Sequence, residues 1–234
     1  MKSLSSELQF LVKVCSRALQ KQVGDNLLLP PVPDGGIDWH LFVREVIRHG
    51  VIALACEGLQ GTTIPQDLLA RLNEARRKQH IGMMLLMREL LLLEQQFAAA
   101  GIGLIALKGP LMAQHLFGGV GYRMSNDLDI LVSAENIHTA QTILYEAGYK
   151  LDYFQNPLSP SQIKHLLTAT AIHLNFRNQE RQIAVELHWR LMVDKQFLPE
   201  AMQKTMVARP QTITLPTGQT VDLLAEGDLL LHLC

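Results

Sequence analysis

Two aspartates two residues apart are the clearest sign of chemistry in this chain. Asp127 and Asp129 lead into the apolar residues 130–132, which have the composition of a buried strand. Residues i and i+2 of a strand point to the same face, so the two carboxylates are predicted to lie side by side. Like charges this close repel unless a cation lies between them, and oxygen ligands suit Mg²⁺. The alternative is a polar strand entry in which Asp127 caps a turn.

A third acid, Glu186, lies in a later segment of alternating pattern. Residues 183–189 alternate apolar and polar side chains, which predicts a strand with Ala184, Glu186 and His188 on one face. Burying a glutamate is costly without a partner, and a metal ion or a substrate hydroxyl would supply one. A face turned to solvent is the alternative. His188 is interpreted first as a packing or orienting group.

The segment before it alternates in the same way. Residues 172–177 are predicted to form a strand with His173 and Arg177 on one face, and residues 178–181 supply a turn. The two strands are therefore predicted to pair as an antiparallel hairpin. His173 and Arg177 either line the same site as Glu186 or face solvent.

Groups suited to binding phosphate precede the aspartates. Lys108 and Gly109 lie between a short apolar run and a predicted helix, where backbone N–H groups, the helix N-terminus and a lysine charge favour an anion. Arg123 and Ser125 lie just before Asp127, where an arginine pairs with phosphate oxygens and a serine donates a hydrogen bond. Each feature alone is more often a turn or a solvated loop, but all of them fall in one stretch.

Helices are predicted for the first hundred residues, before these features. Apolar residues recur at helical spacing over residues 5–19, 39–49 and 51–59, and Asp38 has the type and position of a helix N-cap. The longest segment, residues 65–100, carries a stripe of leucines and methionines. That stripe predicts a helix that contributes to the hydrophobic core.

The pattern changes at Gly101, after which short strands and helices alternate. Strands are predicted over residues 102–107, 127–132 and 149–154, helices over 110–117 and 135–147, and a second hairpin over 212–222. The predicted fold class is α+β. A helical region over residues 1–100 would pack on a mixed-sheet core over 101–222, and residues 223–234 would begin a C-terminal helix.

Composition excludes several classes of protein. With 48% hydrophobic and 18% charged residues, the chain is predicted to be globular and not disordered. The net charge of -1 gives no support for binding nucleic acid or a membrane, although it does not exclude a local basic patch. The three cysteines show no metal-ligand spacing. No signal peptide or membrane span is predicted, so we expect a cytoplasmic protein.

Two stretches together carry a resemblance to a known family. LKGPLMAQHLFGGVGYRMSNDLDILV, residues 107–132, followed by VELHW, residues 185–189, resembles the bacterial uncharacterised nucleotidyltransferase family of the DNA polymerase β-like superfamily. The similarity extends from about Asp38 to the C-terminus.

This resemblance implies a nucleotidyltransferase core with a mixed sheet. It implies that Asp127 and Asp129 hold two Mg²⁺ ions with Glu186 as the third acid. It also implies that Lys108 and Gly109 occupy the position of the superfamily's phosphate-binding turn.

The chain departs from the superfamily pattern at three points. Lys-Gly stands where Gly-Ser is usual, and the third acid is a glutamate in place of an aspartate. The sequence ends at Cys234, where family members continue into a further helical region. We therefore expect a truncated final helix and acceptor-binding residues beyond Cys234.

The leading hypothesis is metal-dependent transfer of a nucleoside monophosphate from a nucleoside triphosphate such as ATP to an acceptor hydroxyl. Two alternatives stay open: a protein of the same fold that binds a nucleotide or partner without turnover, and an antitoxin-like regulator that contacts a partner through its N-terminal helices. The sequence does not identify the acceptor, which is a small molecule, a protein side chain or an RNA end. It identifies neither the preferred base nor the oligomeric state.

Overall fold

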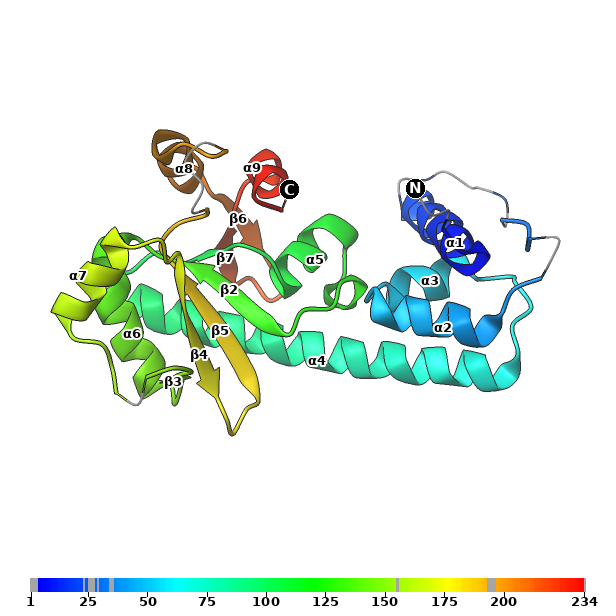
Figure 1. Cartoon of the computed structure of the whole chain (residues 1–234), viewed down its shortest axis with the longest axis horizontal. Helices are drawn as coiled ribbons and strands as arrows, with labels where there is room; N and C mark the ends of the chain where they lie inside the picture. Colours follow the sequence, from blue (N-terminus) through cyan, green and yellow to red (C-terminus); the bar gives the residue numbers. More distant parts are fainter. Residues whose placement is uncertain are drawn as a thin grey trace. The chain divides into compact units, whose positions relative to one another are not determined.

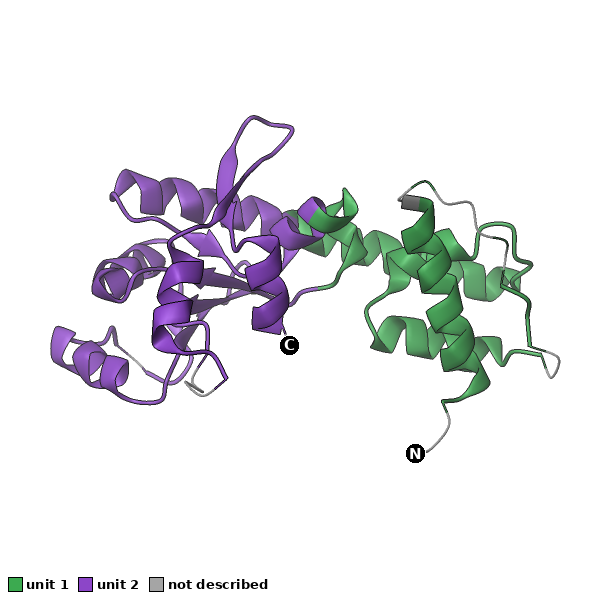
Figure 2. Cartoon of the chain, turned by 90° about the horizontal axis from the view of Figure 1, so that it is seen from above, with its two compact units in different colours: residues 1–84, 116–124 green, residues 85–115, 125–234 purple. Residues whose placement is uncertain are grey.

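A computed structural model of the chain describes residues 4–22, 24, 28, 30–33, 36–154, 156–192 and 197–233. The fold is α+β, as predicted, and combines helices with a seven-stranded mixed sheet (Figure 1). The chain divides into two compact units (Figure 2). Unit 1 comprises residues 1–84 and 116–124, and unit 2 comprises residues 85–115 and 125–234.

Unit 1 is built from helices that share one hydrophobic core. They are α1 (Ser6–Gln22), α2 (Trp39–Arg48), α3 (Ile52–Gly58) and the first part of α4 (Gln66–Ala99). Each was predicted from the sequence to within a few residues, because its apolar side chains recur at helical spacing. The predicted N-cap is confirmed: the Asp38 side chain accepts a hydrogen bond from the backbone N–H of Leu41 at 3.0 Å. The buried cluster includes Phe10, Val14, Phe42, Val46, Ile52, Leu68 and Leu72.

Helices α1 and α3 approach each other unusually closely at Gly58. A Cβ atom at this position would lie 2.0 Å from the carbonyl oxygen of Val14, so only a glycine fits without a backbone shift. The guanidinium of Arg17 donates hydrogen bonds to the carbonyl oxygens of Gly58 and Gln60, at 2.6 and 2.9 Å. The side chain of Arg17 thereby satisfies carbonyl groups at the C-terminal end of α3.

The close approach predicts that Gly58→Ala destabilises the protein. Separating α1 from α3 to make room for the methyl group should cost about 1–3 kcal/mol, as overpacking does elsewhere, and should lower Tm measurably. Gly82→Ala is the matched control, because Gly82 lies within α4 and a Cβ there meets nothing within 4 Å. The control should leave Tm unchanged or raise it, since alanine favours helix. A Gly58→Ala protein as stable as wild type would contradict this packing.

Unit 2 is built on the sheet, whose strand order is β3-β4-β5-β2-β1-β7-β6. Strand β2 pairs in parallel with β5, strand β1 pairs in parallel with β7, and the remaining neighbours are antiparallel. The strands are β1 (Ile105–Ala106), β2 (Asp127–Leu131), β3 (Lys150–Leu151), β4 (His173–Asn178), β5 (Ile183–His188), β6 (Gln211–Thr214) and β7 (Thr220–Leu223).

One face of the central strands is apolar and buried. It is formed by Leu128, Ile130, Leu174, Phe176, Val185 and Leu187. Helix α6 (Ile137–Glu146) packs against this face, since the Tyr145 ring lies edge-on to the Phe176 ring at 6.2 Å between centroids. Because side chains alternate along a strand, the polar residues between these positions point to the opposite face. The apolar face thus fixes the register on which the polar face depends.

The remaining helical elements connect these strands. They are α5 (Pro110–Phe117), η1 (Val120–Tyr122), η2 (Ala134–Asn136), α7 (Pro160–Thr168), α8 (Glu200–Val207) and α9 (Glu226–Leu233). No helix among the described residues is both long and apolar enough to cross a membrane.

Several predicted boundaries differ in the structure. The strands predicted over residues 102–107 and 149–154 each shorten to two residues, because regular ladder pairing covers only those residues. Helix α9 begins at Glu226, not at residue 223, because Leu223 pairs within the sheet. Helices α7 and α8 were not predicted. The start of α7 has a sequence signal, since Ser159 and Gln162 form a capping box there.

Candidate functional site

The register of the central strands brings the acidic residues to one face of the sheet. Asp129 on β2 lies opposite Glu186 on β5, and Asp127 lies two residues earlier on β2. On the other side of β5, His173 of β4 lies opposite His188. Directly opposite residues in a sheet share a face, so five predicted site residues gather over neighbouring strands.

Lys108 reaches into this cluster from the end of β1. The backbone N–H of Leu107 donates to the carbonyl oxygen of Asp129 at 3.0 Å, which extends the pairing of β1 with β2. The next residue then places its ammonium nitrogen 3.0 Å from Oδ1 of Asp129. Gly109 follows with φ of +85°, a left-handed conformation that favours glycine, and α5 begins at Pro110. Lys108 therefore contacts a carboxylate directly. The sequence predicted phosphate binding by this lysine but not its contact with Asp129.

His188 joins two of the acids. Its Nε2 atom lies 3.2 Å from Oε2 of Glu186 and 3.5 Å from Oδ1 of Asp129, and its side chain is buried. The rings of His188 and His173 lie 4.8 Å apart between centroids. The interpretation of His188 as an orienting group fits this position, because it is held between the carboxylates.

Ser125 supports the first aspartate. Its hydroxyl oxygen lies 3.2 Å from Oδ1 of Asp127 and 3.0 Å from the carbonyl oxygen of the same residue. Since Ser125 is two residues before Asp127, this contact fixes the turn that leads into β2 and orients the Asp127 side chain.

Arg177 is a predicted site residue that pairs outside the cluster. Arg177 lies opposite Ala184, and its guanidinium pairs with Asp152 at 3.4 Å, with about half of the side chain exposed. Arg123 follows η1 and belongs to unit 1, whereas the acids belong to unit 2, so its predicted role at the site stays a prediction.

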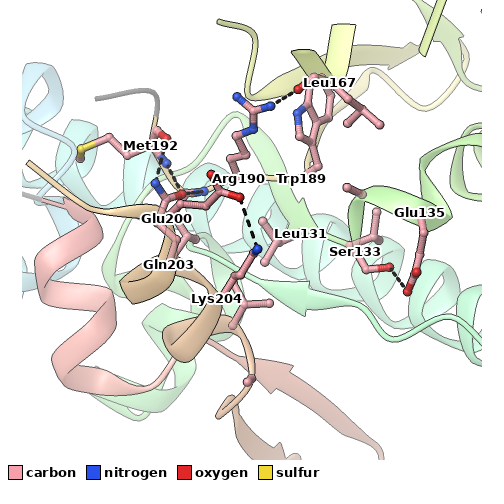
Figure 3. A pocket seen from close by; sticks show the side chains of 15 residues that line it. Leu131, Ser133, Glu135, Leu167, Trp189, Arg190, Met192, Glu200, Gln203 and Lys204 are labelled. Carbon is pink, nitrogen blue, oxygen red and sulfur yellow. Dashed lines mark hydrogen bonds and ion pairs between the residues drawn. The ribbon is translucent and has the colours of Figure 1, made fainter. Parts of the chain in front are cut away.

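A cavity of about 610 Å³ opens where the parallel strands β2 and β5 end (Figure 3). Its walls are mainly apolar. They include Trp189, the residue that follows His188 in the sequence. The Gln203 side chain closes one wall by bonding to the backbone of Leu191, Met192 and Leu198. The wall also carries the Glu200–Lys204 ion pair, at 3.4 Å. The lining includes Leu131, Val132, Leu167, Trp189, Leu191, Met192, Val207 and Ala208.

Comparison with protein families decides the class of this chain. Residues 35–234 match the family described as "Uncharacterised nucleotidyltransferase", and the match contains every predicted site residue. The chain belongs to this nucleotidyltransferase family. Membership supports nucleotidyl transfer as the general chemistry and a nucleoside triphosphate as the substrate. No curated protein and no solved structure matches the chain.

The two aspartates of this nucleotidyltransferase family member differ in their electrostatic surroundings. Burial raises the pKa of Asp127, and the negative charge of Asp129 raises it further, beyond what Lys108 offsets. Burial also acts to raise the pKa of Asp129, but hydrogen bonds from His188 and Lys108 outweigh it and leave the pKa below its usual range. Neighbouring carboxyls with opposite pKa shifts are typical of functional sites.

The surroundings of the site also shift the pKa values of its lysine and histidines. Burial alone would lower the pKa of Lys108 and of His188, but hydrogen bonds to the carboxylates raise both above their usual values. Burial lowers the pKa of His173, and the charge of neighbouring His188 lowers it further. The site therefore favours a charged His188 beside a neutral His173 when no metal is bound.

His232 is near enough to this site to respond to its charges, which the sequence reasoning did not anticipate. It lies on α9, burial lowers its pKa, and the charges of His188, Asp129 and Lys108 act on it. No motif near the end of the chain predicts this position. It follows from the sheet order, in which β7 lies beside β1 and so returns α9 toward the acids.

The residues present fit a divalent metal. Oδ2 of Asp129 is buried and has no hydrogen-bond partner among the described residues, although buried carboxylate oxygens normally have one. Three carboxylates on one face offer oxygen ligands of the kind that Mg²⁺ prefers. Asp127, Asp129 and Glu186 are the residues predicted from the sequence to hold such an ion.

The opposite pKa shifts predict opposite effects of two similar substitutions. A folded-state pKa above the usual value means that ionised Asp127 destabilises the metal-free protein at neutral pH, so Asp127→Asn should raise Tm. The pKa of Asp129 is lowered, so its charge stabilises the protein above the unfolded pKa, and Asp129→Asn should lower Tm.

Each change should amount to a few degrees, which corresponds to about 1 kcal/mol in a protein of this size. Thermal unfolding at pH 7.5 with a chelator measures both. A lower Tm for Asp127→Asn, or an unchanged Tm for Asp129→Asn, would contradict this account of the electrostatics.

Proposed function

We propose that this chain transfers a nucleoside monophosphate from a nucleoside triphosphate to the hydroxyl of an acceptor, with Asp127, Asp129 and Glu186 as its metal-binding and catalytic acids. Membership of the family supports the general reaction. The metal, the acceptor and the roles of these residues are our proposal.

The observation that carries the proposal is the arrangement of the three carboxylates. Asp129 and Glu186 are opposite each other on parallel strands, and Asp127 shares their face. Lys108 and His188 offset part of the negative charge, but one buried oxygen of Asp129 still lacks a partner among the described residues. A cluster of acids that is not fully compensated is costly unless it binds a cation.

The chemistry assigned to the site is an in-line displacement at the α-phosphorus. The acceptor oxygen forms a bond to that phosphorus, the bond to the bridging oxygen breaks, and pyrophosphate leaves with the electron pair. A carboxylate of the cluster takes up the hydroxyl proton. A bound divalent metal would offset the charge of the triphosphate and lower the pKa of the attacking hydroxyl. We expect two Mg²⁺ ions, as the resemblance implies.

The groups around Gly109 are suited to the departing phosphates. Gly109 has a φ of +85°, and its Cα lies close to Ser125 and Asp127, since a Cβ atom there would be 3.8 Å from Ser125 Oγ. The N-terminus of α5 follows directly and favours an anion. When phosphates enter, we propose that Lys108 moves from Asp129 to a phosphate oxygen. Ser125 keeps Asp127 oriented. A role for Arg123 in binding the phosphates stays a prediction from the sequence.

The cavity at the ends of β2 and β5 is a candidate position for one substrate, although none of the three acids lines it. Its volume of about 610 Å³ lies within the range of sites for small molecules, and its largely apolar wall suits a base or an organic acceptor. We propose that one of the two substrates extends into it from the acids. The position follows the general preference of ligands for the carboxyl ends of parallel strands.

The wider context of the proposal rests on the resemblance. A mixed sheet with two aspartates on a central strand is similar to the DNA polymerase β-like superfamily, and we propose that the chain belongs there. A bacterial origin and a cytoplasmic location stay predictions. Contact with nucleic acid finds no support in the net charge of -1.

One observation favours the alternative of nucleotide or partner binding without turnover, as in an antitoxin-like regulator. Lys108 stands in the position expected for a glycine, and its ammonium group occupies a contact of Asp129 that a metal would need. A lysine that stays on Oδ1 of Asp129 would leave only Oδ2 of that carboxylate for a metal. Incorporation of label from a nucleoside triphosphate distinguishes this alternative from catalysis.

The proposal predicts metal-dependent incorporation of label from a nucleoside triphosphate labelled at the α-phosphate. The chain is incubated with each triphosphate, Mg²⁺ or Mn²⁺, and separate pools of small molecules, RNA and protein. Label should enter one pool, with an equal amount of pyrophosphate released. Asp129→Asn should reduce the rate at least about 100-fold, since metal coordination contributes several kcal/mol to such reactions.

Asp152→Asn is the matched control, because Asp152 is an acid of the same unit that pairs with Arg177 away from the cluster. It should keep the wild-type rate. An unchanged rate in Asp129→Asn would overturn the assignment of the site. Nucleotide binding without incorporation into any pool would favour the non-catalytic alternative.

A further inference from the structure

The polar face of the sheet holds two histidines beside its acids. His173, Glu186 and His188 each offer one ligand atom, and these three atoms lie within 4.8 Å of one another. The three carboxylates of Asp127, Asp129 and Glu186 do not meet this distance among the described residues, so they would have to move closer together around an ion. Glu186 belongs to the proposed acid cluster, whereas His173 lies on β4, on the far side of β5 from Asp129.

The backbone places these three side chains without distortion. His173 and His188 are directly opposite across the antiparallel pair of β4 and β5, and Glu186 is two residues before His188 on the same face. Ligands around one ion at about 2.1 Å lie about 3–4 Å apart, so small side-chain rotations would bring these atoms to an ion. The hairpin that positions them is a continuous ladder of six residue pairs.

Independent support comes from unpaired nitrogen atoms. Nδ1 of His173 and Nδ1 of His188 are both buried, and neither has a hydrogen-bond partner within the part of the chain that the structure describes. Buried ring nitrogens normally have a partner. Nε2 of His188, in contrast, lies near carboxylate oxygens of Glu186 and Asp129. An ion shared by His188 and Glu186 would bind Nε2 of His188, the nitrogen that faces the carboxylates, and the unpaired Nδ1 of His173 is available as a further ligand.

The ligand types decide which metal fits. A set of two imidazoles and one carboxylate binds catalytic zinc in some enzymes and non-haem iron in others. Imidazole nitrogen suits the divalent transition metals, whereas Mg²⁺ prefers oxygen and usually keeps its waters. Asp127 and Asp129 offer oxygen alone. The polar face therefore presents two neighbouring ligand sets of different preference, with Glu186 between them.

We propose that His173, Glu186 and His188 form a binding site for a divalent transition metal, of the Zn²⁺, Co²⁺ or Mn²⁺ class, that discriminates against Mg²⁺. This deepens the proposed function, since Glu186 serves both sets. We therefore expect the chain to bind this metal in the absence of nucleotide.

The test is a Co²⁺ titration of the full chain, free of affinity tag and treated with a chelator. Nitrogen ligands should give visible ligand-field absorption that saturates at one ion per chain. Zn²⁺ should displace the Co²⁺, and an excess of Mg²⁺ should not. His173→Gln and His188→Gln should each weaken Co²⁺ binding by more than about 10–100-fold, the loss that even an outer-shell partner causes.

His138→Gln is the matched control, because His138 is an exposed histidine on α6 outside the group. It should bind Co²⁺ as wild type does. Thermal unfolding of each variant without metal shows that it is folded. Co²⁺ binding that survives both substitutions, or that Mg²⁺ reverses as readily as Zn²⁺ does, would overturn the proposal.

Asp127→Asn separates this inference from the proposed function. Asp127 is not part of the histidine group, so this variant should keep Co²⁺ binding while it loses transfer. Nucleotidyl transfer by a wild type that binds no Co²⁺ would overturn the metal proposal and leave the function intact. Co²⁺ binding by a wild type that transfers no nucleotide would support the metal site and count against the function.

Discussion

Repulsion between carboxylates on the adjacent strands β2 and β5 is the constraint on which the structure of unit 2 depends. The register of β2 against β5 sets Asp129 opposite Glu186, and Asp127 shares their face. Water screens such charges poorly at a buried position, and Asp129 is almost fully buried. Lys108 and His188 lie against these acids as partial compensation. The site thus holds more negative charge than its neighbours balance, which is the condition for binding a cation and, through it, a triphosphate.

The apolar face of the same strands maintains this unfavourable arrangement. Leu128 and Ile130 alternate with the two aspartates, and Val185 and Leu187 flank Glu186, so a slip of one residue would bury the acids in the core. Burial of large aliphatic side chains stabilises by roughly 1.5–3 kcal/mol each, which is enough to offset the electrostatic cost. The apolar side chains that stabilise the fold and the acids whose repulsion destabilises it therefore lie on opposite faces of the same strands.

Local patterns in the sequence predicted the parts of the site that depend on the period of a strand. Alternation identified the shared face of Asp127 and Asp129, the face of Glu186 and His188, and the hairpin that carries His173. Features that depend on sheet order were not predictable. The approach of His232 requires β7 to lie beside β1, and the pairing of Arg177 with Asp152 depends on the chain after β3. The contact of Lys108 with Asp129 required knowing that β1 pairs with β2.

Nucleotide binding by the acids is the central claim, and its metal dependence is the most direct test. Calorimetric titration of a nonhydrolysable nucleoside triphosphate would compare wild type with the Asp127→Asn/Asp129→Asn double variant, each with Mg²⁺ and with a chelator. The account predicts binding by wild type with Mg²⁺ and a large loss of affinity in the other three titrations. Equal affinity in the double variant, or in wild type without metal, would contradict it.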